Sequence, residues 1–169
     1  MHVAPMGPHV SDDLSEWTLK PFQSSTTFRN LHGRHRCVIN VVDDALLLAN
    51  AVLGNANNSP SLWTDGLGYV LDGSCHWYAL SIKDWDITQP RAIATCSVCS
   101  TGSKRSFFGW NRAKHAVVEL AILTSRIGLL ESAYLESEIA RLRVLIDKTA
   151  GERENIAFQL LVEHIQRHA

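Results

Sequence analysis

The stretch KPFQSSTTFRNLHGRHRCVINVV, from Lys20 to Val42, decides how the rest of the chain is interpreted. Its hydroxyl residues run from Ser24 to Thr27, and they precede FRNLHG, in which Phe28 and Leu31 stand three positions apart. This spacing predicts one or two helical turns that end at Gly33. The apolar, β-branched run that follows predicts a strand. Hydroxyl side chains therefore gather at the start of a short helix, directly before a strand.

Two interpretations of these hydroxyl groups remain open from the residues alone. A serine or threonine at the start of a helix accepts a hydrogen bond from a free backbone amide, but such a cap needs only one hydroxyl. The same position suits a phosphate, because free amides and the helix dipole attract anions. The nearby cations are Lys20, Arg29, Arg34 and Arg36. The turn is thus a helix cap or a phosphate site.

The composition describes a folded chain with no general affinity for polyanions. The 169 residues are 46% hydrophobic and 20% charged, and the net charge is -1. An anion site must therefore be local. The sequence lacks an apolar run of about 18 residues and a signal-peptide pattern at its start, so we expect a cytoplasmic protein without a membrane span. We expect its cysteines to be reduced: Cys37, Cys75, Cys96 and Cys99.

The first part of the chain, as far as Gly109, predicts short strands. Turn residues separate segments rich in β-branched and aromatic residues, a pattern typical of a small barrel or sandwich. The predicted strands are EWTLKPF, RCVINVV, YVLDGS, CHWYALSIKDW and RAIATCSVCS. Between them, a short helix begins with Asp43 and Asp44 as caps and ends at Gly54, and the NANNSPS that follows predicts a loop.

After Gly109 the pattern becomes helical. Asn111 is a suitable cap for a first helix that ends near Gly128, a second helix fits Glu131 to Lys148, and a third fits 152–168. The apolar positions expected on the inner side of these helices are Ala113, Ala116, Val117, Leu120, Ala121 and Thr124, then Leu135, Ile139, Leu142 and Ile146, then Ile156, Leu160 and Leu161. Such amphipathic helices need a surface on which to pack.

At this point the motifs resemble known families. Ser25, Thr27, Asn30 and Leu31 spell S-x-T-x-x-N-L before CVINV, which resembles the phosphate-binding turn and next strand of flavin reductases with the FMN-binding split barrel. The segments HVAPMG, TTFRNL, VVDDALLLANAVLG and FFGWNRAKHAVVELAILTSR, in this order, resemble the uncharacterised domain of unknown function 447 family. This resemblance covers nearly the whole chain.

The resemblance implies an α+β fold, mainly β: a split β-barrel of the FMN-binding type with a C-terminal helical extension. Residues 1–108 would form the barrel domain, and residues 109–169 would form the extension, which packs on the barrel or on a dimer partner. The implied cofactor is FMN, and the implied assembly is a homodimer. Split barrels usually have a further strand before the segment that matches HVAPMG, so we expect either a missing first strand or a start placed too far downstream.

Carried over position by position, the resemblance implies three groups of flavin-binding residues. The phosphate turn comprises Ser24, Ser25, Thr26, Thr27 and Asn30, with Lys20 as a nearby cation. The strand end whose backbone approaches the flavin ring comprises Pro5, Met6 and Gly7. The opening of the first C-terminal helix, which faces the flavin or its substrate, comprises Asn111, Arg112 and Lys114. His115 belongs to the same signature, with a packing or a catalytic role left open.

Other clusters give weaker signals. Cys96 and Cys99 have the spacing of half a zinc site, but no second such pair exists, and on a strand they would point to opposite faces. The histidine pairs His32 and His35, and His164 and His168, are most simply solvated. We therefore predict no metal and assign no catalytic residue.

Three functions follow. The first is a flavin-dependent oxidoreductase of unknown substrate, in which the cofactor carries the chemistry and no acid-base triad is required. The second is a non-catalytic flavin-binding or regulatory module. The third is a nucleic-acid-binding protein that uses the basic segment from Arg29 to Arg36. The balanced charge and the absence of interleaved aromatic residues do not favour this last function.

Overall fold

The structure of the protein, a computed structural model, describes residues 1–58, 61–64, 66 and 68–168, without the side chains of 57–58 and 61–64. The chain forms two compact units. The sheet unit comprises Met1–Val42 and Ser59–Ser106, and the helical unit comprises Asp43–Asn58 and Phe107–Ala169.

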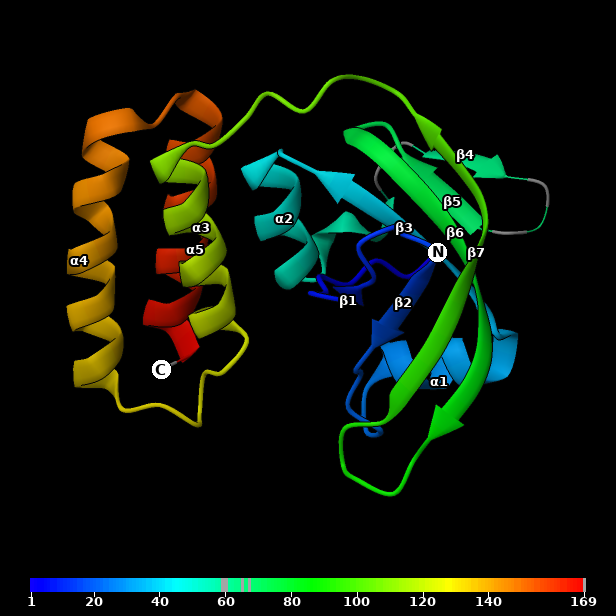
Figure 1. Ribbon diagram of the computed structural model, residues 1–169. Coiled ribbons are helices and arrows are strands. Elements are labelled where there is room, and N and C mark those ends of the chain that lie inside the picture. Colours follow the sequence, from blue (N-terminus) through cyan, green and yellow to red (C-terminus); the bar gives the residue numbers. More distant parts are fainter. Residues whose placement is uncertain (59–60, 65, 67, 169) are drawn as a thin grey trace. The chain divides into compact units, whose positions relative to one another are not determined.

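The sheet unit contains a curled antiparallel sheet with five strands in the order β1-β2-β7-β6-β3 (Figure 1). Its strands are β1 (His9–Val10), β2 (Glu16–Leu19), β3 (Arg36–Val42), β6 (Ser74–Asp86) and β7 (Ile93–Ser103). The long β6 and β7 pair along most of their length, and register shifts between Ala79 and Leu80 and between Ile82 and Asp84 interrupt the pairing. Such bulges increase the local twist, which helps the sheet to curl into a half-barrel.

The core of the sheet unit lies on the inner face of this sheet. Leu80 and Ile82 of β6 are both buried, as period-two alternation requires for residues on one face of a strand. The helix α1 (Thr26–Arg34) adds a single buried side chain, Leu31. The full cluster of buried residues is Trp17, Leu19, Leu31, Leu80, Ile82, Ala94 and Cys96.

A second, two-stranded sheet formed by β4 (Ser61–Thr64) and β5 (Gly68–Leu71) belongs to the same unit. The Asn40 side chain on β3 connects to it: its Nδ2 donates to the Tyr69 carbonyl at 3.2 Å, and its Oδ1 accepts from the Leu71 amide at 2.9 Å. The same oxygen accepts from the Ser74 hydroxyl at 2.7 Å. These bonds tie the outer side of β3, an edge of the five-stranded sheet, to β5.

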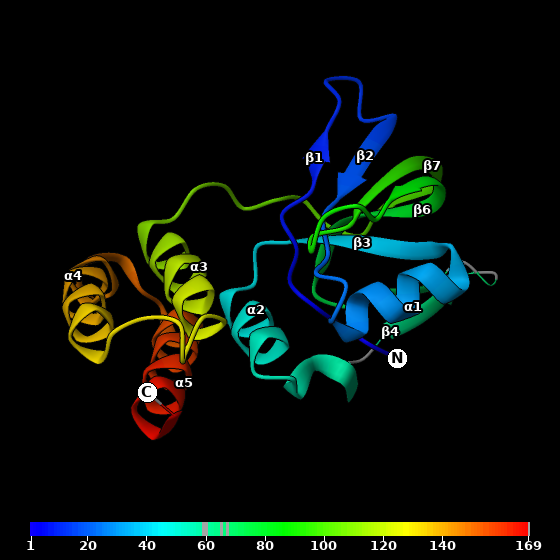
Figure 2. The same ribbon diagram turned by 90° about the horizontal axis from the view of Figure 1, so that it is seen from below.

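The helical unit packs α2, α4 and α5 around α3 (Figures 1 and 2). Its elements are α2 (Ala45–Val52), the 3₁₀ turn η1 (Asn55–Asn58), α3 (Arg112–Thr124), α4 (Ser132–Thr149) and α5 (Glu152–His168). Asp44 caps α2, because its Oδ1 accepts from the amides of Leu46 and Leu47. No helix within the described residues is long and apolar enough to cross a membrane.

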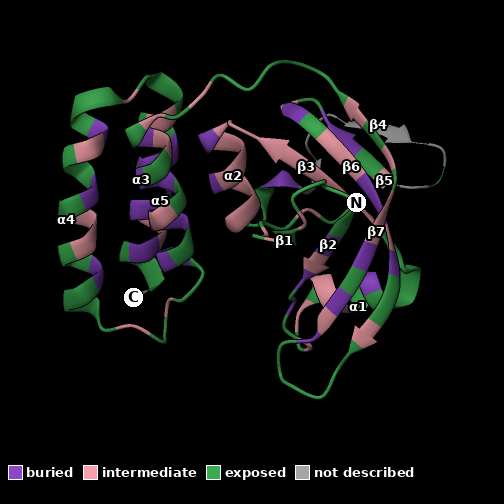
Figure 3. Ribbon diagram, viewed as in Figure 1, coloured by how far each residue is buried: buried purple, intermediate pink, exposed green. Residues whose placement is uncertain are grey.

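Buried residues lie on the facing sides of these helices (Figure 3). All the inner positions predicted for α3 are buried, which confirms that assignment: Ala113, Ala116, Val117, Leu120, Ala121 and Thr124. The stripe predicted for the third helix is wrong at Ile156, which is 43% exposed. The α5 helix instead buries Ala157, Phe158, Leu161, Val162 and Ile165. The helix α5 has apolar residues on two neighbouring faces. The face that contains the large Phe158 is the buried one.

The observed fold confirms an α+β chain with a half-barrel sheet followed by helices. Two local predictions are wrong. The helix α1 passes through Gly33 and ends at Arg34. His35 caps it in a left-handed conformation (φ 53°), and its amide donates to the Leu31 carbonyl at 2.8 Å. The expected loop after α2 begins with the turn η1, and its next two residues, 59–60, lie outside the described residues. The division at residue 108 stays a proposal.

Two glycines give a test of this packing. A Cβ atom at Gly102 would lie 2.7 Å from the Trp77 ring, its cross-strand partner, so Gly102→Ala should lower the free energy of unfolding by about 1–3 kcal/mol. A Cβ atom at Gly33 would meet nothing within 4 Å. Because Gly33 is helical, Gly33→Ala should raise stability by about 0.5–1 kcal/mol. Urea unfolding followed by circular dichroism measures both, and a Gly102→Ala protein as stable as the wild type would contradict the close contact.

Candidate functional site

The hydroxyl residues form the N-terminus of α1, and Ser25 is the capping residue. Its extended backbone (φ -79°, ψ 152°) precedes the helix, and its Oγ accepts from the Phe28 amide at 3.0 Å. The same hydroxyl donates to the Phe22 carbonyl at 2.7 Å. The cap therefore occupies one hydroxyl, and the others at Ser24, Thr26 and Thr27 are not needed for it.

The first amides of α1 remain available to a ligand. Thr26 and Thr27 occupy the first two helical positions, whose amides have no acceptor within the helix. In the described part of the chain, neither amide donates to another backbone or side-chain group. These amides lie at the positive end of the helix dipole, which favours an anion there.

Arg29 brings a cation to the same helix end. Its guanidinium donates to the Thr26 hydroxyl at 2.8 Å and to the Ser24 carbonyl at 3.0 Å, so the side chain folds back toward the start of α1. A positive charge at the positive end of a helix is unfavourable when no anion is present. The arrangement is therefore better suited to an anionic ligand than to helix stability alone.

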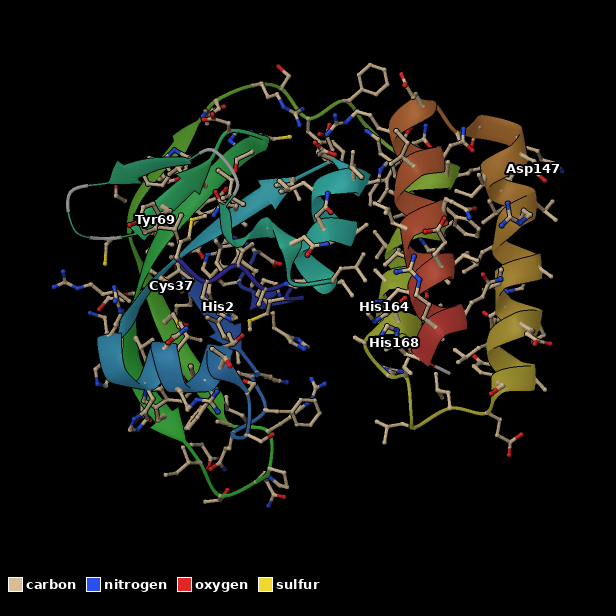
Figure 4. The ribbon with its side chains drawn as sticks, turned by 180° about the vertical axis from the view of Figure 1, so that it is seen from behind. His2, Cys37, Tyr69, Asp147, His164 and His168 are labelled. Atoms are coloured by element: carbon tan, nitrogen blue, oxygen red, sulfur yellow. The ribbon has the colours of Figure 1, made fainter. Side chains whose placement is uncertain are left out.

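His2 reaches this turn from the start of the chain. Its Nε2 lies 3.1 Å from the Thr27 hydroxyl, and Figure 4 shows its place in the sheet unit. His2 is the first residue of the HVAPMG motif, but nothing in the local pattern places it beside a turn 25 positions away. Farther along this segment, Met6 packs against the core of the sheet unit. Gly7 is exposed, and a Cβ there would meet nothing within 4 Å, so the space beside its backbone is open.

Contacts with the β6–β7 loop hold the turn in place. The side-chain Nε2 of Gln23 donates to the carbonyls of Ile87 and Gln89 at 2.9 Å and 2.7 Å. The Arg91 guanidinium lies over the Phe22 ring, 4.2 Å from its centroid. These contacts fix the backbone directly before the capping residue. A turn held in this way loses little conformational entropy when a ligand binds.

Two predicted members of the phosphate site stay unsupported by contacts. Asn30 and Lys20 are exposed, and among the described residues neither makes a hydrogen bond or an ion pair with the turn. Asn30 follows Thr26 by four positions, so it lies on the same helix face, one turn farther from the N-terminus. The assignment of both residues to the site remains a prediction.

The predicted residues of the helical unit have different surroundings. Asn111 caps α3, because its Oδ1 accepts from the amides of Ala113 and Lys114 at 2.8 Å and 3.1 Å. Arg112 is exposed and makes no hydrogen bond or ion pair within the described ranges. His115 is also exposed on α3.

Lys114 is engaged within the helical unit. Its ammonium lies 3.9 Å from the Asp43 carboxylate, whose side chain is only 4% exposed, and 5.4 Å from the centroid of the Phe108 ring. Asp43 also accepts from the Phe108 amide at 2.9 Å. Lys114 thus balances the buried charge of Asp43. It is therefore less available to a ligand than an unpaired cation would be.

The cysteines of the CSVC segment lie on opposite sides of β7. Cys96 is buried in the sheet core and Cys99 is exposed. Burial raises the pKa of Cys96 to about 11, and burial together with the nearby Cys96 raises the pKa of Cys37 to about 12. Both thiols are therefore protonated and unreactive at neutral pH. No group of three or more histidine, cysteine, aspartate or glutamate side chains within the described residues is placed to hold a metal ion.

The contrast between the exposed Cys99 and the protonated Cys37 and Cys96 predicts which thiols can be modified. Brief treatment of the folded protein with iodoacetamide at pH 8 should label Cys99 and leave Cys37 and Cys96 unmodified, because only a thiolate reacts and burial suppresses it. Peptide mass spectrometry measures the labelling, and the same treatment in urea should label all these cysteines. Rapid labelling of Cys37 or Cys96 in the folded protein would contradict the buried, protonated state.

Comparison with protein families identifies the chain. Residues 1–105 match the N-terminal domain of the protein of unknown function DUF447, and residues 111–163 match a second DUF447 region. The chain belongs to the DUF447 family. The resemblance inferred from the motifs is therefore confirmed. No curated protein matches the chain significantly.

Solved structures with similar folds include a further DUF447 protein. An FMN-bound protein of Methanosarcina mazei is 24% identical, with 95% of this chain and 86% of that chain covered and a TM-score of 0.84. The flavin reductase HpaC, complexed with NADP+, is 13% identical over 63% of this chain and 70% of that chain, with a TM-score of 0.52. An FMN-binding protein of Thermus thermophilus is 14% identical over 60% and 62%, with a TM-score of 0.50. These likenesses confirm the split-barrel fold.

Proposed function

We propose that this DUF447 protein binds FMN through the N-terminus of α1 and works as a flavin-dependent oxidoreductase. The observation that carries the proposal is the convergence of the free amides of Thr26 and Thr27 with the guanidinium of Arg29. The choice of FMN is supported by the FMN-bound relative from Methanosarcina mazei.

The residues at this helix end fit a phosphate monoester. Such a group carries close to two negative charges and accepts several hydrogen bonds, as phosphorylated side chains do. The amides of Thr26 and Thr27 would donate to it, together with the hydroxyls of Ser24 and of both threonines. Arg29 would exchange its bond to the Thr26 hydroxyl for a charge-assisted bond to a phosphate oxygen, which is stronger.

The other predicted residues would orient the ring. The open space beside the Gly7 backbone allows a flat ligand to approach, and Met6 next to it is anchored in the sheet core. FMN supplies the electron or hydride transfer when it is bound, so the chain need not provide an acid-base triad. The proposed contributions of Asn111, Arg112 and Lys114 rest on the resemblance. Of the two cations among them, Lys114 is paired with Asp43, whereas Arg112 is exposed.

The phosphate interaction is tested by comparing FMN with riboflavin, which lacks the phosphate. We first expect FMN to be released on denaturation and identified by mass spectrometry. Apoprotein should then bind FMN at least about tenfold more tightly than riboflavin in a fluorescence titration, because hydrogen bonds to a charged group contribute about 1.5–3 kcal/mol. Arg29→Gln should remove most of this preference.

Arg34→Gln is the matched control, because Arg34 is an exposed arginine in the last turn of the same helix. This variant should keep the wild-type preference for FMN. Equal affinity of the wild-type protein for FMN and riboflavin would overturn the phosphate site. A normal preference in Arg29→Gln would exclude only the role of Arg29.

The oxidoreductase activity needs a separate measurement. Anaerobic mixing of the FMN-loaded protein with NADH or NADPH should bleach the visible absorption of the flavin if a nicotinamide is the donor. Retained FMN that neither donor nor another physiological reductant reduces would favour the non-catalytic flavin-binding module. Homodimerisation is likewise proposed from the resemblance, and light scattering tests it.

A further inference from the structure

Two histidines lie together on the last turn of α5, in a part of the helical unit that has no place in the proposed flavin site. His164 and His168 are four positions apart, so their side chains share one helix face. Their rings stack with centroids 4.2 Å apart and planes 25° from parallel. Figure 4 shows both side chains at the same end of α5.

A hydrogen bond fixes the orientation of one ring. The Nδ1 atom of His168 lies 2.8 Å from the carbonyl oxygen of His164. Because a carbonyl can only accept, Nδ1 carries the proton, and in the neutral ring the lone pair is then on Nε2. Histidines that bind metals are commonly oriented in this way, by donating the other ring N–H to a backbone carbonyl.

The charges near this end of α5 do not oppose a cation. The charge of Arg167 is balanced by Glu163, with which it forms an ion pair at 3.0 Å. The C-terminus of α5 is the negative end of the helix dipole, which attracts positive charge.

We propose that His164 and His168 form a two-histidine chelate for a divalent transition metal ion of the zinc, copper and nickel group. Imidazole nitrogen suits these metals. Two nitrogens bound to one zinc ion at about 2.0–2.1 Å lie about 3.3 Å apart in tetrahedral geometry. The His164 ring would therefore rotate toward the Nε2 atom of His168, whose own ring stays hydrogen-bonded. Water completes the coordination, and with two protein ligands the ion is exchangeable.

Such an ion would clamp the last turn of α5. This helix supplies Phe158, Leu161 and Ile165 to the core of the helical unit. Fraying of the last turn exposes Ile165 first, and a metal bridge between positions 164 and 168 opposes it. Binding to the folded state alone then raises the unfolding temperature.

The second neighbouring pair, His32 and His35, is a natural control. Their ring centroids are 6.0 Å apart with planes at 40°, and His35 lies beyond the end of α1 in a left-handed conformation. The His32 ring also packs against Trp85, with centroids 5.7 Å apart. Neither the spacing nor the backbone favours a shared ion there.

The test uses the full chain without a histidine tag. Zinc or nickel chloride is titrated calorimetrically, and the unfolding temperature is measured with and without the metal. Wild-type protein should bind one ion and unfold at a higher temperature with it. His164→Gln or His168→Gln should each weaken binding about 100-fold, because a chelate gains that much from its second ligand, and should remove the thermal shift.

His32→Gln should retain wild-type binding and the wild-type thermal shift. Both glutamine variants on α5 replace side chains that are at least partly exposed, and circular dichroism verifies that each is folded. Absence of binding by the wild-type protein would overturn the proposal. So would wild-type affinity in His164→Gln and His168→Gln, or an equal loss in His32→Gln. None of these outcomes depends on whether the protein binds FMN.

Discussion

Burial of Leu31 against the curled sheet is the interaction on which the candidate site depends. It is the only buried residue of α1, a helix of nine residues that would be marginal alone in water. Burying a leucine side chain contributes about 1.5–3 kcal/mol, enough to hold a short helix against a sheet. The two ends of α1 are then fixed by backbone bonds, from Ser25 to Phe22 and from Ile82 to His35. The amides at its start consequently have a defined direction before any ligand arrives.

Because the turn is rigid, Arg29 is held at the N-terminus of α1. A cation held at the positive end of a helix opposes the dipole, and two amides of the same turn have no acceptor among the described residues. Both features are unfavourable in the free protein and are relieved by one anion. A turn that only capped the helix would need Ser25 and nothing more. The extra donors are therefore better explained by binding than by stability.

Local sequence patterns predicted the parts of the structure that local physics determines. A hydroxyl residue caps α1, as one of the two interpretations expected, and the cap of α2 is Asp44 and not the adjacent Asp43 that was predicted with it. The apolar spacing of α3 matches its buried face. Contacts between distant segments could not be predicted in this way. His2 meets Thr27 across 25 positions, and Gln23 meets Gln89 across 66, because the folded sheet brings these segments together. Motif order identified the segments but not which side chains touch.

A contact between distant segments also explains why the helix was wrongly predicted to end at Gly33. Glycine often ends a helix, and a local pattern gives no reason for α1 to continue. The helix continues because its amide ladder reaches His35, whose carbonyl accepts from Ile82 on β6 at 2.9 Å. The sheet thus sets the length of the helix, and a bond to a distant strand outweighs the local preference of one residue.

The adjacent carboxylates of the helical unit show how one motif can serve two purposes. Asp44 caps α2 and forms an ion pair with Arg153 of α5, while Asp43 holds Lys114 and the Phe108 amide. Two neighbouring charges thus connect α2 with α3 and α5. The buried Asp43 carboxylate requires a positive partner, so the signature lysine has a structural reason to be present whatever the ligand. Arg112 is exposed and has no such partner in the described part of the chain, so its predicted contact with a ligand does not compete with an ion pair.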